Sequence, residues 1–270
     1  MSVKELIIEG GISMNILCIG DIFASCGVEH TKMVLREIIE DESIDFCVAN
    51  AENASGVGIS RKNYDDLTDA GVDFFTLGNH SFGKQDVIKL FETENNIIRP
   101  ANYPEATPGV GSAIVKCKGV KIGIINLMGR VNINLSLDCP FKACDKEIEK
   151  LKKETDIIIV DFHAEATSEK RAMFFYLDGK VSALFGTHTH VQTADESVSK
   201  RGTGYITDLG MTGCEESVLG VDKNIIIDRF TRGVPQKFEY ADGKAVLCGA
   251  VFSIDEETGK CVSVKRIAVR

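Results

Sequence analysis

The sequence predicts an α/β protein, and three observations support this prediction. Short apolar runs alternate with amphipathic stretches whose apolar residues recur at three- and four-residue spacing, from residue 14 to about residue 203. Beyond that point, strand-like runs follow one another with Gly-containing turns between them. The chain has 270 residues, 44% of them hydrophobic, which is enough to bury a sizeable core. No linker-like segment divides it, so we expect one domain over residues 14–270 with a β-rich C-terminal part.

The expected strands and helices follow one another in order along the chain. Apolar runs predict strands at residues 14–20, 45–50, 73–77, 120–127, 156–162 and 181–185. Amphipathic stretches predict helices at residues 31–42, 62–70 (capped by Ser60), 85–93, 142–154 and 168–177. In the C-terminal part we expect strands at residues 205–208, 224–230, 236–240, 245–254 and 262–269, with turns at 242–243 and 258–259.

Residues 1–13 precede the first expected strand and have no evident structural role. The codons for Glu9, Gly10 and Gly11 can resemble a bacterial ribosome-binding site, and Met14 follows a short distance later. We therefore expect Met14 to be the natural start and residues 1–13 to be an extension. The intact mass of natively expressed protein tests this, because a native form that begins at Met1 contradicts it.

Composition excludes several classes of protein. The 31 basic residues are outnumbered by 40 acidic ones, for a net charge of -9, which disfavours long nucleic acids because these bind basic surfaces. No apolar stretch of membrane-spanning length and no secretory-signal pattern is seen, so we expect no membrane segment and a cytoplasmic location. The nine cysteines include no C-x-x-C pair, which argues against a zinc ribbon or a disulfide framework. Buried, reduced thiols are expected at Cys18, Cys47, Cys248 and Cys261.

Histidines, carboxylates and asparagines cluster directly after the expected strands, and four of the five histidines belong to this group. The carboxyl ends of parallel strands share one edge of a sheet, so residues far apart in sequence can converge there. Oxygen and nitrogen donors without thiolate suit metals such as Mn, Fe and Zn. The residues concerned are Asp21, Glu52, Asn53, Asn79, His80, His163, His188 and His190.

Taken singly, these residues have simpler interpretations. Asp21 alone could be a turn or helix-cap residue, and His163 could be a hydrogen-bonded core histidine. His188 and His190 give a stronger signal, since two imidazoles in an irregular turn can face adjacent metals. His30 follows no strand, and we expect it at a helix start or on the surface.

Together, in order, these segments resemble the calcineurin-like metallophosphoesterases over residues 15–190. Two departures narrow the resemblance: Phe23 stands where the superfamily usually has a metal-binding histidine, and Glu52 stands where it usually has a bridging Asp. These variants, with residues 78–83, 186–190 and 207–213, are similar to the bacterial YmdB-like branch, over essentially residues 14–270. The resemblance implies a central two-sheet β-sandwich flanked by helices, with the active site at the C-terminal ends of the strands.

The resemblance also implies two divalent or mixed-valence metal ions, Fe or Mn, lying roughly 3.5–4 Å apart. A hydroxide that bridges them would attack the phosphorus in line, and His80 would act as the general acid that protonates the departing ribose oxygen. Glu52 would bridge both ions. The first ion would be held by Asp21, Glu52, Asn53 and His190, and the second by Glu52, Asn79, His163 and His188.

By this resemblance the substrate is a small phosphodiester, with 2′,3′-cyclic nucleotides first. Phosphomonoesters and 3′,5′-cyclic nucleotides are the alternatives. Two ions bring about four positive charges against two carboxylates, so a site of roughly +2 can hold a phosphoester inside an acidic protein.

Two other interpretations stay open at this point. Residues 78–84 match the G-x-x-x-x-G-K pattern of nucleotide triphosphatases, and Asp161 could imitate their acidic strand, but Gln85 stands where Ser or Thr is needed. A metal-retaining scaffold that acts through partners is the non-enzymatic alternative. His80 argues against it, because a structural metal site needs no additional histidine beside it. The sequence is compatible with a homo-oligomer and leaves the oligomeric state open.

Overall fold

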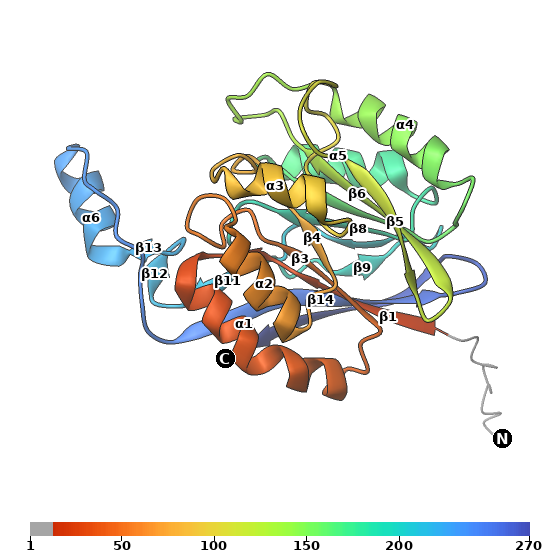
Figure 1. Cartoon of the computed structure of the whole chain (residues 1–270), viewed down its shortest axis with the longest axis horizontal. Coiled ribbons are helices and arrows are strands. Elements are labelled where there is room, and N and C mark those ends of the chain that lie inside the picture. The colour runs from red at the N-terminus through yellow and green to blue at the C-terminus, as the bar shows by residue number, and fades with distance from the viewer. Residues whose placement is uncertain (1–12) are drawn as a thin grey trace, which may run out of the picture.

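The structure is a computed structural model and describes residues 13–270 (Figure 1). The expected extension, residues 1–13, lies outside this range except for Ser13, and the start at Met14 stays a prediction. Two β-sheets pack face to face and helices cover their outer faces, as Figure 1 shows. The predicted α/β sandwich is confirmed.

The first sheet has seven strands in the order β2-β11-β14-β1-β3-β4, with β15 paired to β14. Strands β1, β3 and β4 are parallel, whereas β14 runs antiparallel to β1. The parallel strands therefore end at the same edge of the sheet. The strands are β1 Ser13–Ile19, β2 Asp21–Ile22, β3 Phe46–Asn50, β4 Phe74–Thr76, β11 Met211–Cys214, β14 Ala245–Asp255 and β15 Cys261–Val269.

The second sheet has six strands in the order β5-β6-β7-β8-β10-β9. Strands β6, β7, β8 and β10 are parallel and so also end at one edge. A separate two-stranded hairpin, β12 Ser217–Val218 and β13 Val221–Asp222, lies outside both sheets. The strands of the second sheet are β5 Ser112–Cys117, β6 Val120–Met128, β7 Ile158–His163, β8 Ala183–Thr187, β9 Ser197–Val198 and β10 Gly204–Ile206.

Successive side chains of a strand point to opposite faces of its sheet, so each sheet packs against the other sheet on one face and against helices on the other. In β1, Ile16 and Cys18 face the core between the sheets, while Leu17 and Ile19 face the helices on the other side. Helices α1, α2 and α3 cover the first sheet, and α4 and α5 cover the second. The helices are α1 Ala24–Asp41, α2 Arg61–Ala70, α3 Asp86–Thr93, α4 Pro140–Leu151, α5 Thr167–Leu177 and α6 Lys223–Arg232.

Helix α1 begins at Ala24, well before the predicted start at residue 31. Glycine is disfavoured inside a helix, but Gly27 allows α1 to approach β11: a Cβ at this position would lie 2.2 Å from the carbonyl oxygen of Thr212. His30 consequently lies inside the helix, 6% exposed, with Nε2 3.0 Å from the carbonyl oxygen of Val269. The expectation of a helix-start or surface position for His30 is wrong.

The predicted strand at residues 224–230 is also wrong, because this segment forms α6. Its three isoleucines favour a strand locally, but Asp222 caps the helix by accepting hydrogen bonds from the backbone N of Asn224 (2.8 Å) and of Ile225 (3.2 Å). Gly233 ends it with φ 69°. No strand forms at 236–240 either, where Tyr240 makes an isolated bridge to Val221. With that strand missing, the turn at 242–243 joins no hairpin.

The other predicted helices and the main apolar strands are present, with ends shifted by a few residues. Strands β2, β5, β9, β11, β12 and β13 were not predicted; most are two to four residues long and carry too little pattern to find. Cys18, Cys47, Cys248 and Cys261 are buried free thiols, as expected. Among the helices of residues 13–270, none is long and apolar enough to cross a membrane.

Candidate metal centre

The eight predicted site residues come together at the C-terminal edges of both sheets. Asp21 starts β2 just after β1, and His163 is the last residue of β7. The first sheet also contributes the loops after β3 and β4, which carry Glu52–Asn53 and Asn79–His80. The second sheet contributes the turn after β8, with His188 and His190. The site thus lies where the two sheets meet.

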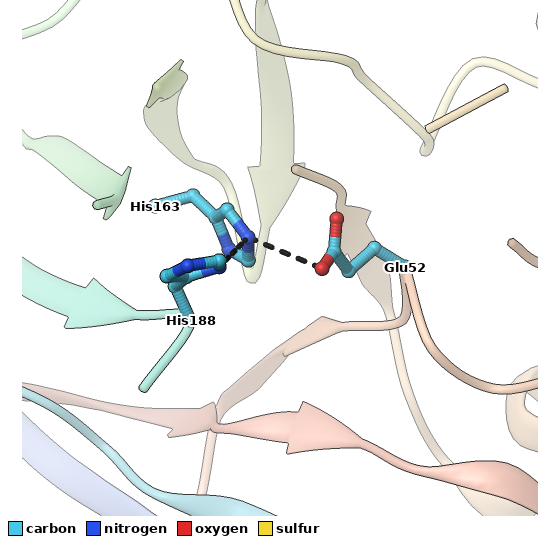
Figure 2. A group of neighbouring side chains, drawn as sticks. All are labelled: Glu52, His163 and His188. Atoms are coloured by element: carbon cyan, nitrogen blue, oxygen red, sulfur yellow. Dashed lines mark hydrogen bonds and ion pairs between the residues drawn. The ribbon is translucent and has the colours of Figure 1, made fainter. Parts of the chain in front are cut away.

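Glu52, His163 and His188 form the tightest group, with ligand atoms all within 4.8 Å of one another, and Figure 2 shows the three side chains pointing toward one another. Nε2 of His163 is 3.1 Å from Glu52 Oε1 and 3.0 Å from His188 Nδ1. Asn79 completes the group, with Oδ1 2.8 Å from the same Nε2. One carboxylate, one amide and two imidazoles therefore surround a single point.

A second group lies on the other side of Glu52. The amide of Asn53 is 3.1 Å from Glu52 Oε1 and 3.3 Å from His190 Nε2. Asp21 Oδ1 lies 3.8 Å from that His190 nitrogen. Glu52 is the residue common to both groups.

Asp21 has one oxygen in use and one without a partner. Its Oδ2 accepts a hydrogen bond from the backbone N of His188 at 2.9 Å. Its Oδ1 is a buried atom that has no hydrogen-bond partner among residues 13–270. Such an oxygen is costly to bury unless something else binds it. Together with the oxygen and nitrogen donors around it, this atom makes the site fit for divalent metal ions.

His163 is oriented by a chain of buried hydrogen bonds that the sequence did not reveal. Thr187 donates to Asp161 Oδ1 at 2.7 Å, which leaves its hydroxyl oxygen to accept from His163 Nδ1 at 2.9 Å. Asp161 also accepts hydrogen bonds from Thr76 (2.5 Å) and Asn50 (3.0 Å). This arrangement directs His163 Nε2 into the site, the role that outer hydrogen bonds play around metal-binding histidines. Asp161 therefore helps to orient His163 through Thr187 and is not part of a phosphate-binding loop.

His188 and His190 are held in a different way. Both have positive φ, 99° and 64°, so the turn is irregular and separates the two rings. Nε2 of His188 is 3.1 Å from Glu165 Oε2, a carboxylate partner that no pattern in the sequence indicated. His190 has Nδ1 3.2 Å from the carbonyl oxygen of Leu219, and Phe23 packs edge-on to its ring at 5.5 Å.

The charged groups of the site shift one another's pKa values. Burial alone would raise the pKa of the Glu52 carboxyl, but the positive charges of His163 and His80 lower it to about 2. Burial alone would lower the pKa of His163, but the carboxylates of Glu52, Asp21 and Asp161 raise it to about 9. Burial, aided by the charge of His163, lowers the pKa of His188 to about 3. His163 is therefore the cation that balances the acids when no metal is bound.

His80 is half-buried and lies directly after Asn79. Its backbone N donates to Glu52 Oε2 at 2.7 Å. The same loop thus carries Asn79, which faces His163, and His80, whose charge helps to lower the pKa of Glu52. The rival phosphate-loop pattern of residues 78–84 coincides with this loop, and α3 begins only at Asp86.

Comparisons with known proteins identify the family of the chain. The model of the family described as "YmdB-like protein" matches residues 17–267. A curated relative from Bacillus subtilis (strain 168), named 2′,3′-cyclic-nucleotide 2′-phosphodiesterase, is 44% identical over 257 residues, which cover 95% of this chain and 97% of the relative.

Two solved structures share the fold over nearly their whole length. A crystal structure of a hypothetical protein from Thermus thermophilus is 39% identical, with a TM-score of 0.88 and coverage of 94% of this chain and 98% of that one. A crystal structure titled as a novel phosphatase, from Mycoplasma pneumoniae, is 33% identical, with a TM-score of 0.90 and coverage of 96% and 94%. The predicted metallophosphoesterase fold is thereby confirmed. By its sequence and its architecture, the chain belongs to the YmdB-like family of the calcineurin-like metallophosphoesterases.

Proposed function

We propose that this protein hydrolyses small phosphodiesters, with 2′,3′-cyclic nucleotides as its first substrate class, by means of two metal ions. As a member of its family it is a phosphoric ester hydrolase. The observation that carries the proposal is the convergence of Glu52, His163 and His188 within 4.8 Å. The substrate class is supported by the name of the Bacillus subtilis relative.

The two groups of side chains correspond to two ions that share Glu52. The position of Glu52 Oε1, 3.1 Å from both His163 Nε2 and the Asn53 amide, supports its role as the bridge. The mixed oxygen and imidazole donors suit Mn, Fe and Zn, and the family resemblance favours Fe or Mn among these. The proposed ligands are Asp21, Glu52, Asn53 and His190 for the first ion, and Glu52, Asn79, His163 and His188 for the second.

Bound metal ions would supply positive charge for the phosphate oxygens and would activate the attacking water. The protein's own residues do the rest. His80 would hold the proton that the leaving ribose oxygen needs; its backbone N donates to Glu52 Oε2, and the charge of its side chain helps to lower the pKa of Glu52. Asp161 and Thr187 keep His163 in one orientation throughout.

A phosphomonoesterase is the second candidate, and the Mycoplasma pneumoniae structure, titled as a phosphatase, is the observation that favours it. Hydrolysis of 3′,5′-cyclic nucleotides is a further alternative. A cytoplasmic location, a homo-oligomer and a single domain over residues 14–270 stay predictions.

The direct test is hydrolysis by the metal-stripped protein after addition of Mn²⁺ or Fe²⁺ separately. We expect 2′,3′-cyclic AMP to be cleaved faster than 3′,5′-cyclic AMP and p-nitrophenyl phosphate. Glu52→Gln should lose activity with every ester, since the bridging charge is removed. Faster cleavage of p-nitrophenyl phosphate would favour the phosphomonoesterase, and inactivity on all esters would favour the scaffold.

A further inference from the structure

The turn that carries His188 and His190 needs support from the rest of the fold. Both residues have positive φ, which non-glycine residues rarely adopt. This backbone directs one ring toward His163 and the other toward Asn53. On a regular strand, two residues at this spacing would point to the same face. The separation of the two rings therefore depends on whatever fixes the residue between them.

That residue, Thr189, is held by the carboxylate of Asp208, which follows β10. Thr189 donates to Asp208 Oδ2 from its backbone N at 3.2 Å and from Oγ1 at 2.8 Å. The other oxygen, Oδ1, accepts from the backbone N of Gly210 at 2.8 Å. Asp208 is 1% exposed, so water does not compete for these bonds.

Lys170 of α5 provides the charge that balances Asp208. Its Nζ donates to the same Oδ2 at 2.6 Å, and both side chains are 1% exposed. The lysine passes Gly186 of β8 on its way, where a Cβ would lie 2.9 Å from Lys170 Cδ. A buried ion pair of this kind often adds no stability over apolar residues of similar size, so general stability is a weak reason for its presence.

We propose that Lys170, Asp208 and Thr189 form a positioning device that sets the 188–190 turn for metal binding. Asp208 fixes Thr189 from both its backbone and its hydroxyl, and Lys170 neutralises that carboxylate and holds it in place. All three act through the backbone of the turn rather than as ligands. The inference rests on the proposed function for its metal, but it assigns a role to residues that the proposed function does not use.

Thr189→Val in the full chain is the sharpest test, because it removes the hydroxyl bond and keeps the side-chain volume. We expect the metal-stripped variant to bind Mn²⁺ at least about tenfold more weakly than the unaltered protein, as losses of outer hydrogen bonds around metal ligands do. Amide hydrogen exchange over residues 187–191 should also quicken in the metal-free variant. Thr189→Ser keeps the hydroxyl and should restore both values.

Thr203→Val is the matched control. Like Thr189, Thr203 has a hydroxyl that donates a hydrogen bond: its Oγ1 donates to the carbonyl oxygen of Val181 at 2.8 Å, but this bond lies at the opposite ends of β8 and β10. The control should leave Mn²⁺ affinity and the exchange of residues 187–191 unchanged. If Thr189→Val and Thr203→Val weaken Mn²⁺ binding equally, the effect reflects a general loss of stability, and the inference is overturned.

The inference is also overturned if Thr189→Val matches the unaltered protein in both Mn²⁺ affinity and exchange. Failure of the proposed function has a different signature: the unaltered protein would then take up neither Mn²⁺ nor Fe²⁺. The exchange rates of the metal-free proteins would still decide whether the bond to Asp208 holds the turn.

Discussion

Glu52 contacts both groups of proposed ligands. One oxygen faces His163 and the Asn53 amide, and the other accepts from the backbone N of His80. The side chain is 1% exposed, so its charge acts at short range in a medium of low polarity. A change at Glu52 is therefore expected to reach both metals and the loop that carries His80.

His80→Ala should separate proton donation from metal binding. We expect kcat to fall by about 10²- to 10⁴-fold, the usual contribution of a general acid, while the metal content stays the same. Activity on 2′,3′-cyclic AMP and metal analysis of the same sample measure the two effects. His30→Ala is the matched control, because His30 is buried in α1 and bonded to Val269, and should leave kcat unchanged. Loss of metal from the His80 variant would instead make His80 a ligand.

Metal binding should release protons, because His163 is the cation of the metal-free site. With its pKa raised to about 9, His163 is protonated at neutral pH, and it must lose the Nε2 proton to become a ligand. Glu52, with its pKa lowered to about 2, has no proton to lose there. We expect release of about one proton per chain at pH 7, and apparent affinity that rises with pH up to about pH 9.

Calorimetric titration with Mn²⁺ in buffers of different ionisation enthalpy measures this release. The released proton should disappear in titrations above pH 9, since the metal-free His163 is then already neutral. Binding at pH 7 without proton release would show that His163 is neutral in the metal-free site or is not a ligand.

The sequence indicated which residues converge at this edge of the sheets, but it did not indicate the residues that support them. Each proposed ligand follows a strand that the sequence predicts, so its position along the chain carries the signal. Glu165 and Thr187, in contrast, contact His188 and His163 only because separate strands and helices fold together. No local pattern marks such partners, and without tertiary geometry they look like ordinary polar residues.

At the scale of elements, α6 shows why local propensity failed. Its isoleucines favour a strand, and the decisive signals were Asp222 at its start and Gly233 at its end. Figure 1 shows α6 standing away from the two sheets. Ile226 is its buried residue, whereas Phe230 is 78% exposed. The predicted start of α1 was wrong for a different reason: a glycine inside the helix is explained only by the closeness of Gly27 to β11.

Trypsin should therefore cut the α6 segment before it cuts the rest of the protein. A ten-residue helix is marginal in isolation, so local opening exposes the cleavage sites at Arg229, Arg232 and Lys237. Time-resolved digestion with mass spectrometry should find the first cuts between residues 223 and 237. Asp222→Ala should speed this cleavage, because loss of the cap costs about 1 kcal/mol.

Ser60→Ala is the matched control, as Ser60 caps α2 by accepting from the backbone N of Asn63, far along the chain from α6. It should leave the first cuts and their rate unchanged. Resistance of residues 223–237 to trypsin would show that this segment is covered in solution, for instance by a second copy of the chain, and size measurement by light scattering would distinguish that case.

At the scale of the whole molecule, the site joins the two sheets. Asp21 comes from the first sheet and His163 and His188 from the second, with Asp21 Oδ1 3.8 Å from His163 Nδ1. Metal ions held by residues of both sheets would link the two sheets. They would also stabilise the charged form of the Asp21 carboxylate, whose pKa is raised mainly by burial. The positive charge of two such ions would let a protein with a net charge of -9 bind a phosphoester.

Removal of metal should consequently lower the stability of the whole fold. A ligand present at about a hundredfold its Kd stabilises the folded state by about 2.7 kcal/mol. For a chain of this length, that corresponds to a Tm shift of roughly 5–10 °C. We expect chelation to lower Tm by that amount and Mn²⁺ to restore it, as followed by calorimetry. Asp21→Asn should shrink the Mn²⁺-induced shift, because the charge of a ligand is lost, whereas His80→Ala should preserve the shift. A Tm that does not respond to Mn²⁺ in the unaltered protein would contradict a metal centre that joins the two sheets.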